Sequence, residues 1–211
     1  MAVERLSAHL ELPPDLQQEP GVVLGYLTGR RIASDRLRIG PGAYLRSGTV
    51  VYAGTVIGAG LQTGHNVVIR EENEIGDEFN IWNNSTVDYG CRLGHRVKIH
   101  CNCYVAQFTV LEDDVFLGPG VIATNDPHPG CPQFRQCMRG PTLRRGAKIG
   151  GNTTLLPFVE IGAGSLIGAG SVVTRDIPPG VLAYGNPARV VKRVEELTCE
   201  FGFREGPYRD V

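Results

Sequence analysis

The chain has 211 residues, of which 42% are hydrophobic, and its 21 Lys and Arg nearly balance its 22 Asp and Glu. These values fit one globular domain with a packed core, and the balanced charge excludes a general electrostatic attraction to nucleic acid or to an anionic membrane. No apolar run approaches the ~20 residues of a membrane-spanning helix, and GVVLGYL at residues 21–27 is too short and too rich in glycine for a signal peptide. We therefore expect a cytoplasmic protein whose six cysteines are reduced thiols.

The first 38 residues show no repeating pattern. SAHLELPPDLQQEP at residues 7–20 is polar and rich in proline, and the apolar run VVLGYL follows it. Because repeat proteins need a terminal segment that covers their first unit, we predict that residues 1–38 cap the repeat that begins after them. We find no second domain.

From Ile39 onward, an aliphatic residue recurs at almost every sixth position. The period holds without a slip as far as Ala123, and it resumes at Leu143 and continues to Val173. A helix repeats at 3.6 residues and a strand at two, so neither alone explains a period of six. The residues in this phase are Ile39, Leu45, Val51, Ile57, Thr63, Ile69, Ile75, Ile81, Val87, Leu93, Ile99, Val105, Leu111, Leu117, Ala123, Leu143, Ile149, Leu155, Ile161, Ile167 and Val173.

Two further positions of each hexapeptide are restricted. Gly, Asn or Asp is common three residues after the aliphatic position, as at Gly42, Asn84 and Gly164, and a small or β-branched residue usually follows. Gly, Asn and Asp favour tight or left-handed turns. Each hexapeptide is therefore predicted to be a short strand plus a corner, and stacked hexapeptides form a parallel β-solenoid. A propeller, with a period of about 40 residues, does not fit a period of six.

This pattern resembles the hexapeptide repeat of the acyltransferases that fold as a left-handed parallel β-helix. The resemblance covers about residues 39–178 and implies an all-β fold with three hexapeptides per coil, or about seven coils. The left hand comes from the resemblance alone, because right-handed crossovers are the general rule. The resemblance also implies acetyl-CoA as the acyl donor and a homotrimer with active sites between subunits.

A coil of 18 residues brings corner residues into columns. Asn84 and Asn102 share one column with Asn66, and Gln107 and Asn125 share another. Stacked asparagines form amide ladders and tolerate left-handed turns. Asn84 and Asn102 are equally well placed to bind a substrate, so both interpretations stay open.

Residues 124–142 interrupt the repeat at the corner that holds Asn125. Insertions of this length in a compact fold are usually functional or disordered, and the prolines, two cysteines and phenylalanine of this one favour order. In similar acyltransferases, such a loop is extruded over a neighbouring subunit. Asn125 and Asp126, with Asn84 and Asn102, are our candidates for holding the substrate or the attacking amine.

In the C-terminal segment, residues 179–211, we predict an α-helix. Asn186 can cap it, with Pro187 as its first residue. The helix would present one apolar stripe and would cover the open strand edge at the end of the solenoid. This stripe would consist of Val190, Val191, Val194 and Leu197.

The stretch YGNPARVVKR at residues 184–193 also resembles the segment that closes the coenzyme A site in this family. The resemblance implies that the turn residues and a glycine corner lie along the pantetheine arm, and that basic side chains lie near the nucleotide phosphates. The residues assigned in this way are Gly168, Ala169, Gly170, Asn186, Pro187, Ala188, Arg189, Lys192 and Arg193.

Four stretches, IWNNSTVDYG, IHCNCYV, LEDDVFLGPG and TNDPHP, are similar to the family branch that N-acetylates amino sugars on nucleoside diphosphates in surface polysaccharide synthesis. The similarity covers about residues 75–190. Acetyl transfer requires a neutral amine and a group that takes its proton. Related amino-sugar transferases have a histidine base at the position of Gln107, and a glutamine side chain cannot accept a proton at neutral pH.

Other histidines are candidates for this base. His128 lies on the interrupting loop near Asp126, which could orient its imidazole. His100 follows the inward position Ile99 and so points outward. We predict that His128, or else His100, is the catalytic base or proton relay, although histidines are commonly exposed without any function. A substrate amine that is already partly neutral would need no base.

Three other functions stay open. O-acetylation of a sugar or small molecule is the first. The second is a metalloenzyme similar to the γ-class carbonic anhydrases, which share the solenoid, because His95 and His100 resemble two of their zinc ligands. Against it, His65 occupies a different corner from the expected third ligand, and YGNPARVVKR would have no role. The third is a binding scaffold without catalysis.

A metal site on the interrupting loop is a further possibility. His128, Cys131 and Cys137 lie close together in sequence, but their spacing matches no strong zinc signature. We therefore predict no bound metal. Small-molecule substrates are the expected partners, with no nucleic acid and no membrane.

Overall fold

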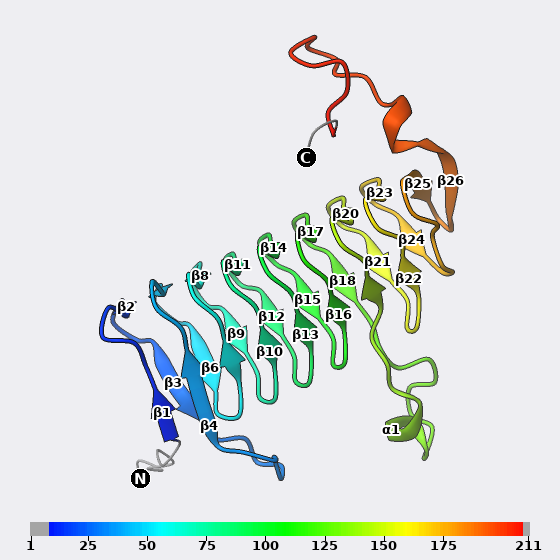
Figure 1. Cartoon of the computed structure of the whole chain (residues 1–211). Helices are drawn as coiled ribbons and strands as arrows, with labels where there is room; N and C mark the ends of the chain where they lie inside the picture. Colours follow the sequence, from blue (N-terminus) through cyan, green and yellow to red (C-terminus); the bar gives the residue numbers. More distant parts are fainter. Residues whose placement is uncertain (1–8, 209–211) are drawn as a thin grey trace.

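The computed structural model describes residues 9–208, so the outermost parts of the two predicted terminal segments lie outside the described residues. Within this range the chain winds into a three-sided prism of very short parallel strands (Figure 1). The strands stack into three sheets, here called A, B and C, and each coil passes through A, B and C in that order. This is the parallel β-solenoid that the six-residue period predicts, with the left-handed winding that the family resemblance implies.

The three sheets are built from strands of two to six residues. Sheet A contains β1 (His9–Glu11), β4 (Arg36–Ile39), β7 (Val56–Ile57), β10 (Glu74–Ile75), β13 (Arg92–Leu93), β16 (Val110–Leu111), β19 (Thr142–Leu143) and β22 (Glu160–Ile161). Sheet B contains β2 (Gln17–Gln18), β5 (Tyr44–Leu45), β8 (Gln62–Thr63), β11 (Asn80–Ile81), β14 (Lys98–Ile99), β17 (Phe116–Leu117), β20 (Lys148–Ile149), β23 (Leu166–Ile167), β25 (Val181–Gly185) and β26 (Ala188–Arg193). Sheet C contains β3 (Val23–Tyr26), β6 (Val50–Tyr52), β9 (Val68–Ile69), β12 (Thr86–Val87), β15 (Tyr104–Val105), β18 (Ile122–Ala123), β21 (Thr154–Leu155) and β24 (Val172–Val173).

The residues that recur at every sixth position form the core. Every residue in that phase from Ile39 to Val173 points into the prism and is at most 5% exposed. The small residues after the turns are buried too, and their hydroxyls bond to backbone carbonyls, as Thr55 does to Arg70 at 2.6 Å. Because these hydroxyls have partners, their burial leaves no unsatisfied donor. The predicted aliphatic interior is confirmed.

Strands β1, β2 and β3 correct the prediction of a separate N-terminal cap. They pair in parallel with β4, β5 and β6, so residues 9–26 form one more coil ahead of the seven predicted. Paired residues here are 27 positions apart, as Leu10 and Leu37 are, whereas Glu74 and Arg92 of the later coils are 18 apart. The period hides this coil because residues 27–35 loop out between β3 and β4.

The prediction of a C-terminal α-helix from Asn186 is wrong for the described residues. Instead, β25 and β26 form an antiparallel hairpin, and one 3₁₀ turn (η1, Val194–Glu196) follows it. Asn186 and Pro187 lie in the hairpin turn, where the peptide bond between them is cis. Strand β25 stacks on β23, and β26 then pairs with the free edge of β25. The backbone N–H and C=O groups on that edge of β25 need hydrogen-bond partners, and β26 supplies them. Val190 and Val191 are β-branched and favour a strand over a helix.

Two loops leave the prism along the same edge (Figure 1). Residues 27–35 connect β3 to β4, and residues 124–141 connect β18 to β19, so both pass from sheet C to sheet A. The second loop is the one that the interrupted repeat predicts, and it contains one short helix, α1 (Phe134–Cys137). None of the described helices has the length and hydropathy needed to cross a membrane.

The edges of the prism are named here by the sheets that they join. The A–B edge includes residues 94–97, and the B–C edge includes residues 100–103 and 168–171. The C–A edge includes residues 88–91 and 106–109, together with the two loops. Side chains on one edge can meet from coil to coil, whereas different edges of one chain are separated by a sheet.

The coils stack so closely that the A–B edge admits no side chain at Gly40. A Cβ there would lie 2.6 Å from backbone atoms of Gly58 and Ala59 in the next coil. Because backbone cannot yield as a flexible side chain does, Gly40→Ala should lower the free energy of unfolding in urea by about 1–3 kcal/mol. Gly29→Ala is the control, since its Cβ would meet nothing within 4 Å, and its effect should stay below about 0.5 kcal/mol. Equal losses in the two variants would contradict this account of the stacking.

Candidate active site

Three of the predicted site residues lie at the root of the extruded loop, on the C–A edge. Asn125 is buried at 9% exposure, whereas His128 is exposed. The carboxylate of Asp126 accepts a hydrogen bond from the backbone N–H of His128 at 2.9 Å. The structure therefore corrects the expected contact between Asp126 and the imidazole. Asp126 fixes the loop backbone, and the His128 ring lies outside this hydrogen bond.

The other predicted catalytic and substrate residues lie on the B–C edge. His100 is half-buried, and its ring meets the ring of Phe116 edge-on, with 5.5 Å between centroids. Asn84 and Asn102 have φ angles of +58° and +60°, and Asn84 accepts a hydrogen bond from Asn66 at 3.2 Å. This left-handed geometry and amide ladder support the structural interpretation of the asparagine column. A single chain does not bring these residues together with His128.

The residues assigned to coenzyme A gather at the C-terminal end of the same B–C edge. Residues 168–170 form the corner of the last full coil, and the hairpin turn of residues 186–188 stacks on that corner. The backbone N–H of Gly185 donates to Ser171 Oγ at 3.2 Å. Tyr184 packs so closely on Gly168 that an added Cβ would lie 2.8 Å from its Cβ. The fold therefore brings these two predicted groups together.

The predicted basic residues are divided along the hairpin. Arg189 adjoins the turn and lies opposite Tyr184. Lys192 and Arg193 lie at the far end of β26, toward the A–B edge, and Arg193 Nε pairs with Glu195 at 2.8 Å. Only Arg189 of the three stays beside residues 168–170 and 186–188.

A buried carboxylate on the C–A edge was missed by sequence reasoning. Asp88 is 4% exposed, and its two oxygens accept four hydrogen bonds. The donors are Tyr104 Oη at 2.6 Å, Gln107 Nε2 at 2.5 Å, Arg70 Nη1 at 3.0 Å and the backbone N–H of Tyr89 at 2.8 Å. A carboxylate that accepts hydrogen bonds from four neighbours holds those neighbours in place.

Gln107 connects Asp88 to the root of the loop. Its Oε1 accepts a hydrogen bond from Asn125 Nδ2 at 2.6 Å. The 18-residue columns correctly place Gln107 next to Asn125. Asp88 is 19 residues before Gln107, so it falls outside that column and the column analysis did not identify it. Burial and the hydrogen bond to Asp88 raise the pKa of Tyr104, so this phenol remains a proton donor at neutral pH.

Farther along the C–A edge, Glu71 is fully buried. Arg30 of the 27–35 loop reaches its carboxylate at 2.6 Å, and Arg70 reaches it at 3.0 Å. Arg30 also pairs with Glu72 and lies over the ring of Tyr89, 3.8 Å from its centroid. Burial acts to raise the pKa of Glu71, but the hydrogen bonds from Arg30 and Arg70 outweigh burial, and the net effect lowers this pKa. The 27–35 loop is thus held on the prism by a buried ion pair.

Neither metal hypothesis gains support from the structure. All six cysteines are free thiols, and burial raises the pKa of Cys91 to about 12. Among residues 9–208, no three or more His, Cys, Asp and Glu side chains are arranged to hold a metal ion. His95 lies on the A–B edge, where its ring accepts the backbone N–H of Asp77 at 3.0 Å, whereas His100 lies on the B–C edge.

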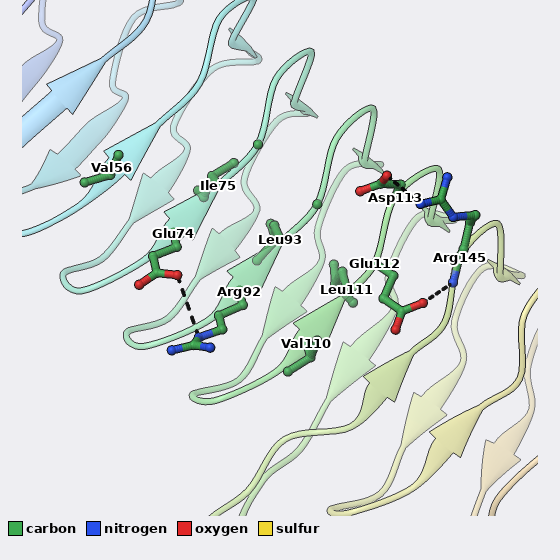
Figure 2. A pocket seen from close by; sticks show the side chains of 12 residues that line it. Val56, Glu74, Ile75, Arg92, Leu93, Val110, Leu111, Glu112, Asp113 and Arg145 are labelled. Atoms are coloured by element: carbon green, nitrogen blue, oxygen red, sulfur yellow. Dashed lines mark hydrogen bonds and ion pairs between the residues drawn. The ribbon is translucent and has the colours of Figure 1, made fainter.

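Two surface hollows lie away from these residues. Figure 2 shows the hollow on sheet A, of about 720 Å³, where Glu74 faces Arg92 and Arg145 pairs with Asp113. The second, of about 860 Å³, lies on sheet B, and Tyr208 contributes to its lining. The side chains that line these two hollows include none of the predicted catalytic or substrate residues, so neither hollow locates the reaction.

Comparison with known proteins connects this fold to a family. A model of the bacterial transferase hexapeptide (six repeats) matches residues 140–175. Over 204 residues, the chain is 34% identical to the bifunctional protein GlmU of Rubrobacter xylanophilus, a match that covers 89% of this chain and 40% of that protein. Over 118 residues it is 42% identical to SAR2635 of Staphylococcus aureus, which is named as an acetyltransferase, with coverage of 51% and 58%.

A solved structure shares the architecture. The product of the Bacillus cereus BC4754 gene aligns with a TM-score of 0.54 at 24% identity, and the match covers 82% of this chain and 84% of that one. These matches support the hexapeptide-repeat acyltransferase family that the sequence pattern resembles, and the solved structure supports its fold. It spans 40% and 58% of the lengths of the two curated relatives.

Proposed function

We propose that the chain is an acetyl-CoA-dependent acetyltransferase that acts on an amino sugar, carried on a nucleoside diphosphate, in surface polysaccharide synthesis. The family match supports acyl transfer, and the four stretches quoted above support the amino sugar. One observation carries the proposal. The loop root with Asn125 and His128, and the glycine corner at residues 168–170, lie on the two edges that border the same face, sheet C.

Residues 168–170 and 186–188 suit the pantetheine arm of coenzyme A, which is long and narrow. A Cβ at Gly170 would meet nothing within 4 Å, so an extended ligand has room beside this backbone. Arg189, next to the turn, supplies a cation for a phosphate. Lys192 and Arg193 lie farther along the hairpin, toward the A–B edge, and would contact only the far end of a long ligand. Bound there, acetyl-CoA supplies an acetyl thioester.

Sheet C is the face on which we expect further copies of the chain to pack. The outward side chains of its strands are uncharged, namely Val23, Val50, Val68, Thr86, Tyr104, Ile122, Thr154 and Val172. Sheet A, by contrast, presents charges such as Glu74 and Arg92. A closed ring of subunits around their sheet C faces would place the C–A edge of one beside the B–C edge of the next. We therefore propose a homotrimer, with each site shared by two subunits.

In such a ring, His128 is our proposed base. It would take the proton from the acceptor amine as the new C–N bond forms and the thioester C–S bond breaks, and it would return that proton to the departing thiolate. Asn125 and Asp126 would hold the amine from the same loop. The B–C edge of the partner subunit would provide the opposite wall, with the partner's Asn84, the partner's Asn102 and the partner's His100.

The proposal is tested by incubating the purified chain with acetyl-CoA and a panel of acceptors. The panel contains nucleoside-diphosphate amino sugars, free amino sugars and the matched sugars that carry only hydroxyls. We expect free thiol to be released only with an amine acceptor, and fastest with the nucleotide-linked sugars. Equal turnover with hydroxyl-only sugars would favour O-acetylation. No turnover with any acceptor would remove the acetyltransferase proposal.

A further inference from the structure

A series of hydrogen-bonded polar side chains crosses three successive coils on the C–A edge. Asp88, Gln107 and Asn125 belong to these coils in turn, with hydrogen bonds of 2.5 Å and 2.6 Å between them. Asp88 is 4% exposed and Asn125 is 9% exposed. The series runs from the buried carboxylate to the loop that carries His128.

The direction of every hydrogen bond in this series is set by Asp88. An ionised carboxylate only accepts hydrogen bonds, so Gln107 must offer its Nε2 amide group to Asp88. Its carbonyl Oε1 then faces the next coil and accepts Nδ2–H of Asn125. Neither amide can be reversed without placing two acceptors, or two donors, against each other. The negative charge of Asp88 therefore fixes the orientation of Asn125.

This orientation leaves Asn125 Oδ1 as the available end of the series. Among residues 9–208, no hydrogen bond engages Oδ1, whereas the backbone carbonyl of Asn125 accepts the N–H of Arg139 at 2.9 Å. Asp126 and His128 follow directly on the same loop. An acceptor held in place at this position is matched to an N–H or O–H donor of a ligand.

We propose that Asp88 and Gln107 are positioning residues, which hold Asn125 so that its Oδ1 accepts the N–H or O–H of the group to be acetylated. This inference rests on the proposed function and extends it to three side chains on the C–A edge. The amide ladder between Asn66 and Asn84 on the B–C edge is different. Those side chains are not anchored to a buried carboxylate, and they occupy left-handed corners that explain their residue type.

The main test is Gln107→Met, which keeps the length of the side chain and removes both hydrogen bonds. Acceptor KM should rise about tenfold or more, because Asn125 loses its orientation, while the KM of acetyl-CoA stays within about twofold. Gln62→Met is the matched control. Gln62 lies on sheet B, and its amide makes only a long 3.4 Å contact to Gly42, so both KM values should stay unchanged.

A second variant, Gln107→Glu, directly tests the direction of the hydrogen bonds from Asn125 to Gln107 and from Gln107 to Asp88. When protonated, this side chain can donate to Asp88 and accept from Asn125, as the glutamine does. When ionised, it opposes Asp88 and cannot donate. Activity relative to the wild type should therefore fall as pH rises. The charged and titratable groups around this pair are Arg70, Tyr104, Tyr89, Cys91 and Tyr52, with Glu71 and Arg30 beyond Arg70. These groups are identical in both proteins.

The outcomes separate this inference from the proposed function. Unchanged acceptor KM in a stable Gln107→Met protein, or a flat activity ratio for Gln107→Glu across pH, would overturn the inference while acetyl transfer stands. Should Gln107→Met fail to fold, Gln107→Glu decides. If the wild type acetylates nothing, crystal structures still decide, comparing the wild type with folded Gln107→Met, or with Gln107→Glu at a pH at which the new carboxyl group is ionised. Asn125 must rotate when its partner is altered, and an unmoved side chain refutes the positioning role.

Discussion

His128→Ala is expected to lower kcat for acetyl transfer by about 10²–10⁴-fold, the usual contribution of a general base. The loop that carries His128 leaves the prism at Asn125, and Asp126 holds its backbone by accepting the N–H of residue 128. The variant removes only an exposed imidazole, so this backbone hydrogen bond and the fold should persist. Acceptor KM should change less than kcat, because substrate binding is assigned to Asn125 and Asp126. Steady-state kinetics at saturating acetyl-CoA measures both quantities.

Two other histidine variants complete the experiment. His95→Ala is the control, because His95 lies on the A–B edge beside Asp77 and should leave kcat within about twofold. His100→Ala tests the alternative base on the B–C edge. A large loss in His100→Ala together with a normal rate in His128→Ala would transfer the role of base to His100. Normal rates in both would favour an acceptor amine that is already neutral and needs no base.

Glu71→Ala should lower the free energy of unfolding by about 3 kcal/mol. The Glu71 side chain is fully buried, and its removal leaves Arg30 and Arg70 without the carboxylate that they share. Removing one side of an ion pair that is buried at the carboxylate is costly, because Arg30 keeps only Glu72 and Arg70 keeps only Asp88 as ionic partner among residues 9–208. Glu74→Ala is the control. Its side chain is 71% exposed on sheet A, 3.8 Å from Arg92, and such surface pairs contribute at most about 1 kcal/mol. Urea unfolding followed by circular dichroism measures the difference.

The pH dependence of stability provides a check on the same residue. The pKa of Glu71 is lowered in the folded chain from its ordinary value of 4.5. A lowered pKa stabilises the fold at pH values above 4.5, and this contribution is lost as pH falls through the folded-state value. The unfolding free energy of the wild type should therefore decline more steeply below about pH 4.5 than that of Glu71→Ala. Parallel declines would show that Glu71 is not ionised within an ion pair.

The core of the fold could be predicted because a β-helix repeats its environment at fixed intervals. Each residue in phase from Ile39 to Val173 meets the same inward position, so periodicity alone assigns it. The ends of the prism lack that regularity. Residues 9–26 pair 27 positions away because a loop intervenes. At the other end, the cap at Asn186 and the apolar spacing after it fit a helix, but the segment pairs with the available edge of β25 as a strand.

The candidate site was predictable in part for a similar reason. Column positions correctly placed Gln107 next to Asn125, and the break in the repeat identified the loop with His128. Asp88 and Glu71 were not found, because their importance depends on burial beside Arg70 and not on any sequence motif. Arg30 was out of reach as well, since its contact with Glu71 spans 41 residues and starts from the irregular 27–35 loop.

Each coil adds a fixed length to the prism along its axis. Five coils separate the points where the 27–35 and 124–141 loops depart, which corresponds to about 24 Å at the strand spacing of ~4.8 Å. Inserting or deleting one 18-residue unit would keep every edge and every inward position intact, yet it would lengthen or shorten that interval by one step. Adding or removing whole coils, in evolution or by design, can therefore change the distance between the 27–35 and 124–141 loops in fixed steps while the core packing stays the same.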